Sequence, residues 1–283
     1  MPTTQQPGKI KWLFERNVFS DGNPEKMVRA VQAGGMQCAQ VGYVSAGEDG
    51  FGLEPVDPVP FSDEDPVMVY GSMNLCRWLL CQKRWPRLAW YDFDRLRCQS
   101  YYAQWGEFLL QREYAFMPLA ELYRRHDWVF RILGRDGTIF VRPDDNDKSF
   151  SGGPVQRAGF QEWYKLANFY DPGPDCLVVV SSPEAIHSEW RSVIGQRQTI
   201  TGSLYRQNGA EVISSEFPTD AADFAARVAN ATAFDPHPIY VMDVCSTADG
   251  YRLVEIGSMC AASLYACDVE KVVRTASRIV AGV

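Results

Sequence analysis

The sequence predicts an α/β (α+β) protein in which short apolar strands lead into helices. Three observations support this class. Short apolar runs recur along the chain and are followed by turn residues and helical patterns. Residues 240–256 show the alternation and central turn of a β-hairpin. The length of 283 residues, 46% of them hydrophobic, suffices for a large core and two lobes.

The first 130 residues mix strand and helix patterns. A helix is expected to begin at Asn23, which we take as its N-cap, with Pro24 in the first turn, and to end at Gly34. Gly71 and Ser72 separate a buried strand from a second helix. The expected elements are strands at 11–15 and 67–70, a helical run after Ser72 through Leu80, and an aromatic helix at 94–110.

A new unit is expected from about residue 128. Its elements are a strand at 138–142, a polar loop at 143–153, a helix at 159–168, a strand at 176–181, a hairpin of 189–194 with 198–205, a capped helix at 219–230, the hairpin at 240–256, and a helix from 268 to 280 with Asp268 as N-cap. We therefore expect three units, at 1–127, 128–185 and 186–283.

The hairpin at 240–256 carries one acid on each strand, Asp243 and Glu255. A three-residue loop of residues 248–250, with Gly250 in the left-handed conformation, places the two acids directly opposite each other. Opposed side chains share one face, with Cβ atoms about 5 Å apart, close enough to hold one hard cation. A two-residue loop at Asp249-Gly250 would instead shift the register and put them on opposite faces. The pair could also be only the polar face of the hairpin.

Composition excludes several functional classes. The net charge is −7 without a block of Lys or Arg, which argues against binding to nucleic acid or an anionic membrane. The eight cysteines form no CxxC pair and there are only three histidines, so a zinc site is not expected. No signal pattern or apolar run of 18 residues is present. We expect a reduced, soluble, cytoplasmic protein.

A basic strand end and a loop of small residues form the first candidate phosphate site. Arg142 ends the strand at 138–142 and Lys148 lies in the loop that follows. Arginine offers a planar fork for phosphate oxygens, lysine a mobile point charge, and small residues let backbone amides approach. The loop lacks the GxxxxGK[ST] pattern of a P-loop. Phe150 and Gln156 exclude a calcium loop that starts at Asp145. The alternative is an Asp-rich surface turn.

The strand at 177–181 ends in Ser181-Ser182, where backbone groups could meet an adenine edge; a buried strand ending in a turn is the alternative. Glu189 and Arg191 follow on one face of the next strand. By themselves they could form an ordinary solvated ion pair.

In their order along the chain these segments resemble the ATP-grasp superfamily, from about residue 130 to residue 283. The resemblance implies two α+β lobes that grip ATP, preceded by an N-terminal α/β domain. It implies phosphate contacts for Arg142 and Lys148, adenine contacts for Val180, Ser181 and Ser182, and ribose contact for Glu189. It further implies Mg²⁺ ligation by Asp243 and Glu255.

Other segments are similar to the divergent R-two-K clade of this superfamily, found in phages and bacteria and related to a eukaryotic factor that helps assemble translation initiation factor two. They are Phe140-Val-Arg-Pro, Ser188-Glu-Trp-Arg, Ser263-Leu-Tyr, Val69-Tyr-Gly-Ser and Trp90-Tyr-Asp-Phe. The chain departs from the family at two points. Gly257 replaces the usual third metal ligand, an asparagine. The family's first nucleotide lysine has no clear equivalent, with Arg95 and Arg97 as candidates.

The resemblance implies an ATP- and Mg²⁺-dependent carboxylate–amine or carboxylate–thiol ligase that acts through an acyl phosphate, with a peptide or protein as a possible substrate. Arg191 and Arg206 are the residues expected to meet the acyl phosphate or the substrate carboxylate. A non-catalytic, ATP-binding assembly factor is the main alternative, and a purely structural phage protein is the third.

Overall fold

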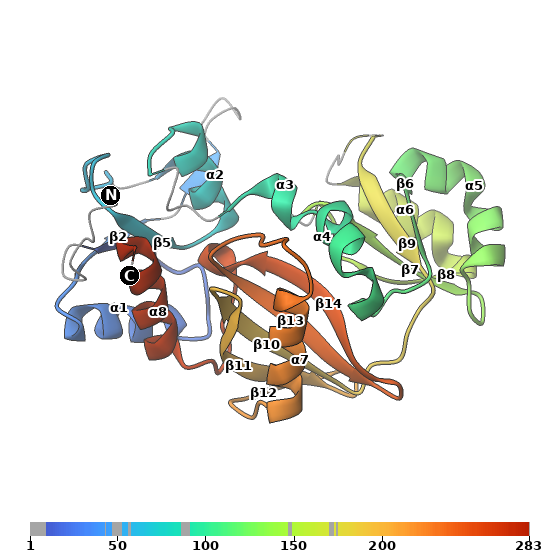
Figure 1. Cartoon of the computed structure of the whole chain (residues 1–283). Helices are drawn as coiled ribbons and strands as arrows, with labels where there is room; N and C mark the ends of the chain where they lie inside the picture. The colour runs from blue at the N-terminus through green and yellow to red at the C-terminus, as the bar shows by residue number, and fades with distance from the viewer. Residues whose placement is uncertain are drawn as a thin grey trace.

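The computed structural model describes residues 10–42, 44–46, 53–55, 58–85, 91–146, 149–169, 173 and 175–282. Strands in these residues form four sheets, in the orders β2-β1-β5, β3-β4, β6-β9-β7-β8 and β12-β11-β10-β13-β14. Figure 1 shows the three larger sheets as separate groups along the molecule, with the five-stranded sheet between the other two.

The N-terminal unit is a small parallel sheet with helices. Its elements are β1 (Lys11–Glu15), α1 (Asn23–Ala33), β2 (Gln37–Val41), β3 (Val44–Ala46), β4 (Leu53–Pro55), β5 (Val67–Tyr70) and α2 (Met73–Cys81). Strand β1 pairs in parallel with both β2 and β5. The expected N-cap Asn23 is wrong by one residue: Gly22, at φ 68°, precedes the helix, and Asp21 accepts a hydrogen bond from the Asn23 N–H at 3.0 Å.

The expected aromatic helix at 94–110 is interrupted. The structure has α3 (Phe93–Leu96), α4 (Cys98–Trp105) and the 3₁₀ turn η2 (Gly106–Phe108), with extended backbone at Arg97. Asp144 explains the break, because its carbonyl accepts from the Cys98 N–H at 2.9 Å and its carboxylate from the Gln99 N–H at 2.8 Å. The loop after β7 thus caps α4 from outside the helix.

The second sheet is antiparallel and covered on one face by helices. Its elements are β6 (Tyr114–Pro118), α5 (Leu119–Ile132), β7 (Thr138–Pro143), β8 (Gly153–Gln156), η3 (Arg157–Gly159), α6 (Phe160–Phe169) and β9 (Leu177–Ser181). Residues such as Leu122, Phe160 and Val180 share one core between the sheet and α5 and α6. Strand β6 precedes residue 128, so this sheet begins earlier than the expected start of its lobe.

The five-stranded sheet is also antiparallel. Its elements are β10 (Ser188–Gly195), β11 (Gln198–Gln207), β12 (Ala210–Ser214), α7 (Thr219–Asn230), β13 (Ile239–Thr247), β14 (Gly250–Ser258) and η4 (Met259–Ala261). Helix α7 packs on one face of this sheet through Phe224 and Val228. It begins after Pro218 without a side-chain cap, so the expected cap is wrong.

The last helix, α8 (Val269–Ala281), returns to the N-terminal unit, where it lies beside α1 (Figure 1). Asp268 is its N-cap, as expected, and accepts from the Lys271 N–H at 3.1 Å. Val272, Val273 and Ala276 share a core with β1, α1 and β5. The first and last helices of the described chain are therefore packed together, and the five-stranded sheet lies between the other two large sheets (Figure 1).

The helices of the described ranges include none with the length and apolar content needed to cross a bilayer.

Candidate active site

Asp243 on β13 and Glu255 on β14 are opposed, which confirms the predicted register. The predicted loop is wrong. Thr247 pairs with Gly250, so the loop has two residues, 248 and 249, and the register near the turn is shifted by one. A β-bulge between Asp243 and Val244 restores the register, because Val254 is inserted in β14 without a partner. Gly250 has the expected positive φ, 101°.

Each acid is held by an arginine from another strand. Arg191 on β10 grips Asp243 with two bonds, Nε–Oδ1 at 2.9 Å and Nη2–Oδ2 at 2.7 Å. Arg142 on β7 donates from Nη2 to Glu255 at 2.8 Å and from Nη1 to the carbonyl of Val254 at 3.3 Å. The inserted residue of the bulge therefore supplies a carbonyl that orients the guanidinium. These pairs explain how two opposed carboxylates are accommodated without repulsion.

Glu189 lies beside this group. Its carboxylate accepts from the Tyr205 hydroxyl at 2.8 Å and pairs with Arg206 at 3.4 Å. Tyr205 also reaches Asp243, at 3.4 Å. Burial, and after it the negative charges of Asp243 and Glu189, raise the pKa of Tyr205, so the hydroxyl stays protonated and donates.

Tyr205 occupies a second β-bulge, between β10 and β11, where Glu189 opposes Arg206 and Trp190 opposes Leu204. Sequence reasoning missed Tyr205, because a residue inserted in a strand has no signature in the apolar alternation.

Arg191 is fully engaged. Besides Asp243, it donates from Nη1 to the carbonyl of Ser263 at 2.9 Å, and its guanidinium lies 5.2 Å from the Tyr265 ring centre. Tyr265 has φ 50° and stacks on Tyr205 with centroids 5.1 Å apart. A tyrosine in the left-handed region is strained and persists because its surroundings hold it there. Arg206, by contrast, has a side chain that is 53% exposed.

The loop after β7 packs tightly against Arg142. A Cβ atom on Gly152 would come within 2.8 Å of the Arg142 Cβ, so this close approach requires glycine. Lys148 lies outside the described residues.

The strand end expected to meet adenine is only partly accessible. Val180 and Ser181 are paired on both sides, with β6 and β7, so their backbone is not exposed as expected. The Val180 side chain lies in the core under α5 and α6. Ser182 donates its N–H to the carbonyl of Glu113 at 3.1 Å. In the connection to β10, residues 183–186 form no backbone hydrogen bond with another described residue, and pairing resumes at His187.

Ser181 lies on the other face of the sheet from Val180. It is one residue further along β9, and Val179 on that face is the cross-strand partner of Arg142. The Ser181 hydroxyl is buried without a hydrogen-bond partner in the described parts of the chain. Such an atom is costly to leave unpaired and marks the Arg142 face as a place for a further polar group.

Asn146 is a site residue that the sequence did not reveal. Its Nδ2 donates to the carbonyl of Ile256 at 2.9 Å, which brings the amide over Gly257. A Cβ built on Gly257 would lie 3.7 Å from Asn146 Oδ1. The amide thus occupies the space beside the position where the family has asparagine. The sequence did contain one signal. Position 257 has glycine instead of asparagine, and an asparagine, Asn146, is present in the loop after β7.

A cavity of about 220 Å³ lies beside the two acids. Asn146, Arg191, Asp243, Glu255 and Tyr265 line it, together with residues of the N-terminal unit. Within the described ranges no three His, Cys, Asp or Glu side chains converge. Carboxylate and amide oxygens are ligands that suit Mg²⁺, so the residues present fit this ion.

The two candidates for a first nucleotide cation are engaged elsewhere. Arg95 donates to the carbonyl of Asp235 at 2.9 Å, and Arg97 pairs with Asp94 at 3.4 Å and Asp144 at 3.5 Å.

Comparison with known proteins decides the family. The family described as ATP-grasp domain, R-two-K clade family 3, matches residues 98–276. The chain belongs to the R-two-K clade of the ATP-grasp superfamily. No curated protein matches.

Solved structures agree on the fold. The D-cycloserine synthetase DcsG has a TM-score of 0.66 at 13% identity, over 96% of this chain and 99% of its own. D-alanyl-alanine synthetase A from Vibrio cholerae has a TM-score of 0.61 at 10% identity, over 98% and 100%. The ATP-grasp ligase PsnB, complexed with minimal precursor, Mg and ADP, has a TM-score of 0.53 at 14% identity, over 98% and 99%. The predicted ATP-grasp fold with mixed helices and strands is confirmed.

Proposed function

We propose that this ATP-grasp protein is an ATP- and Mg²⁺-dependent carboxylate–amine ligase that acts through an acyl phosphate. The observation that carries the proposal is the opposed pair of Asp243 and Glu255, each bound to a guanidinium and both lining one cavity with Asn146. The similar structures named above are a synthetase of D-cycloserine, a D-alanyl-alanine synthetase and a ligase bound to a peptide precursor. They support a ligase and, through the last, a peptide or protein substrate.

Asp243, Glu255 and Asn146 are the residues that would hold Mg²⁺. A carboxylate has about four lone-pair sites, so Asp243 and Glu255 can bind their arginines and still face a cation. Bound Mg²⁺ supplies charge neutralisation at the β- and γ-phosphate oxygens of ATP.

Arg142 and Lys148 are proposed to bind the phosphates. The Arg142 fork is positioned by the Val254 carbonyl and Gly152, and its partner Glu255 is a ligand in the proposed metal site. A metal ion at Glu255 would weaken the ion pair with Arg142, and the guanidinium would then be free to meet phosphate oxygens. After this exchange Glu255 would still face a cation and Arg142 an anion, so neither charge would be left without a partner.

The nucleoside is proposed to lie between the two sheets. Ser181 offers an unpaired hydroxyl on the Arg142 face, and the backbone of residues 183–186 offers the free edge for adenine. Val180 contributes to this edge only by packing β9 against its helices. Glu189, ordered by Tyr205 and Arg206, is the acceptor for ribose hydroxyls.

The two remaining arginines have different roles. Within the described residues the hydrogen bonds of Arg191 go to Asp243 and to the carbonyl of Ser263, so we assign Arg191 to positioning the metal acid. Arg206 is half exposed and can meet the substrate carboxylate or the acyl phosphate.

In the reaction, a carboxylate oxygen attacks the γ-phosphorus and ADP leaves; an amine then attacks the acyl carbon and phosphate leaves. Catalysis is mainly positioning and charge stabilisation.

The test is an acceptor screen with amino acids, polyamines and short peptides, with Mg-ATP present. ADP release and trapping of the acyl phosphate by hydroxylamine are the two measurements. We expect ADP and hydroxamate from the wild-type protein and neither from Asp243→Asn, with both proteins showing the same circular dichroism. Tight binding of ATP without ADP or hydroxamate, with any acceptor or with a host lysate, would overturn the ligase and favour the assembly factor.

A further inference from the structure

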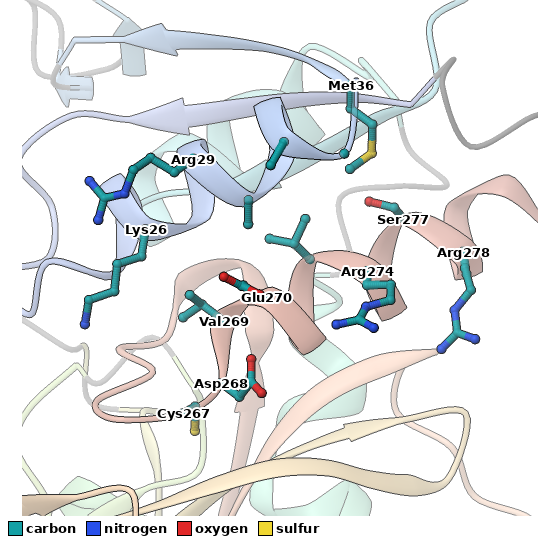
Figure 2. Close-up of a pocket in the computed structure, with 14 residues that line it drawn as sticks. Lys26, Arg29, Met36, Cys267, Asp268, Val269, Glu270, Arg274, Ser277 and Arg278 are labelled. Carbon is teal, nitrogen blue, oxygen red and sulfur yellow. The ribbon is translucent and has the colours of Figure 1, made fainter.

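A groove separate from the candidate active site lies between α1 and α8, the first and last helices of the described residues (Figure 2). Its volume is about 900 Å³, in the range of pockets that bind ligands. The floor is apolar and is formed by Ala30, Met36, Val269 and Val273. Helix packing has thus left a wide apolar depression between α1 and α8.

Four exposed cations surround this floor, Lys26 and Arg29 on α1 and Arg274 and Arg278 on α8. None of them forms an ion pair, a side-chain hydrogen bond or a ring contact with another described residue. In the described part of the chain only two further cations share this condition, Lys83 and Arg131. The free positive charge of an acidic protein, of net charge −7, is therefore concentrated at one groove.

The acids of the groove do not cancel this charge. Asp268 caps α8 and pairs with Lys271 at 3.6 Å, so its charge is already balanced. Glu270 is the other acid of the lining. Four cations against one unbalanced acid leave a positive surplus.

The cations are spread along the groove. Figure 2 shows Lys26 and Arg29 toward one end and Arg274 and Arg278 toward the other. On each helix the two cations are three or four residues apart, which places them one turn apart, about 5–6 Å. A compact anion such as phosphate cannot reach both ends, whereas an elongated chain with several carboxylates can.

We propose that this groove binds a peptide segment that carries carboxylates and apolar side chains, as the docking segment of a peptide or protein substrate. The apolar side chains occupy the floor and the carboxylates meet the four cations. The proposal rests on the proposed ligase function only where it calls the bound peptide a substrate.

The groove adjoins the candidate active site through residues 263–268. Ser263 and Tyr265 line the active-site cavity, and Cys267 and Asp268 line the groove. The start of α1 is tied to the same loop, because Asn23 Nδ2 donates to the carbonyl of Tyr265 at 2.7 Å and Ser263 Oγ donates to Asp21 at 2.6 Å. A peptide held in the groove therefore lies against the loop whose preceding residues line the cavity.

The test is a selection from phage-displayed random peptides on the full chain without ATP, followed by fluorescence anisotropy with the most enriched peptide. We expect enrichment of sequences that combine Asp or Glu with Leu, Ile or Phe. Arg274→Glu/Arg278→Glu should weaken binding about tenfold or more. Lys83→Glu/Arg131→Glu makes the same change in net charge outside the groove and should leave affinity within about twofold. Replacing the acids of the peptide with Gln or Asn should match the loss in the groove variant.

Because ATP is absent, the result does not depend on ligase activity. Equal losses in both double variants, enrichment without acidic residues, or no enrichment would overturn the proposal. So would sedimentation showing a dimer that Arg274→Glu/Arg278→Glu dissociates, since the occupant would then be a second copy. Should Arg274→Glu/Arg278→Glu melt below the wild type, Arg274→Gln/Arg278→Gln replaces it with the same expectation.

Discussion

At the scale of single residues, the candidate site is a set of acids whose charges are already balanced. Arg191 binds Asp243 through two bonds, and Arg142 binds Glu255. A guanidinium stays protonated at any working pH, so a metal cation and Arg142 compete for the charge of Glu255 even though the carboxylate has lone pairs for both. Nucleotide and metal are then expected to bind together, since phosphate oxygens offer Arg142 a new partner.

This coupling predicts opposite effects for one substitution. Arg142→Ala should strengthen binding of Mg²⁺ alone, by about tenfold, because Glu255 loses a cation 2.8 Å away. The same variant should weaken ATP more than AMP, because AMP lacks the β- and γ-oxygens. Titration calorimetry with Mg²⁺, ATP and AMP measures all three, and Arg142→Lys serves as the charge-conserving control. Weaker Mg²⁺ binding in Arg142→Ala would refute the exchange.

Asn146 and Gly257 offer a second test, in which one ligand replaces another. Asn146→Ala should lower Mg²⁺ affinity about tenfold in the presence of ADP. Asn146→Ala/Gly257→Asn should recover most of it, because the new side chain enters the space that Asn146 leaves. Its Cβ would lie 3.3 Å from Val241, so a small shift of that side chain is needed. Mn²⁺ binding followed by electron paramagnetic resonance reports the site without turnover; no recovery in the double variant would exclude Asn146 as the substitute ligand.

At the scale of elements, apolar alternation located most strands, and Lys11–Glu15 and Val67–Tyr70 have the predicted bounds. The β13–β14 hairpin shows what apolar alternation cannot predict, namely the loop length and the position of a bulge. The sequence placed Asp243 opposite Glu255, yet the loop is one residue shorter than predicted and a bulge at Val254 compensates. The bulge is supported from outside the hairpin, since the Val254 carbonyl accepts from Arg142 on β7. Contacts between distant segments produce this bulge, the break at Arg97 and the position of Asn146 beside Gly257. Local sequence patterns do not encode such contacts.

The segment before β13 carries a histidine whose titration should be visible in stability. His237 is buried, and its Nε2 accepts from the Asp92 N–H at 3.0 Å, next to α3. Burial lowers the pKa of His237 to about 4, below its usual 6.5. The unfolded chain therefore binds the proton more readily. The stability contributed by the neutral ring is complete above pH 6.5 and is lost as the pH falls toward 4.

Between pH 7 and pH 5 we expect this residue to account for a loss of about 2 kcal/mol in the free energy of unfolding. His237→Gln keeps an acceptor for Asp92 but does not titrate, so its stability should fall less over the same interval. Urea unfolding at the two pH values gives the difference. Equal losses in the two proteins would show that His237 titrates normally in the folded state.

At the scale of the whole molecule, the family match and the cooperative unit have different boundaries. The matched segment begins at residue 98, after the N-terminal sheet. Yet Val272 and Val273 of α8 lie in the same core as Trp12 and Met68. Trp12 Nε1 donates to Ser277 at 3.1 Å, and the Tyr70 hydroxyl donates to the carbonyl of Ala262 at 2.9 Å. The N-terminal unit therefore completes the fold that holds the site.

The final prediction follows from this shared core. A fragment of residues 98–282 should fail to unfold cooperatively and should bind the dye ANS, because the buried face of α8 loses its partners and exposes Val272, Val273 and Ala276. The matched control is the full chain cut between Arg97 and Cys98 at an engineered protease site, with both pieces retained. Its cut lies in the extended backbone between α3 and α4, so the core is intact and one cooperative transition should remain. If the isolated fragment shows the same sharp transition as the cut chain, α8 is stable without the N-terminal unit, and the site should then bind Mg-ATP in the fragment as well.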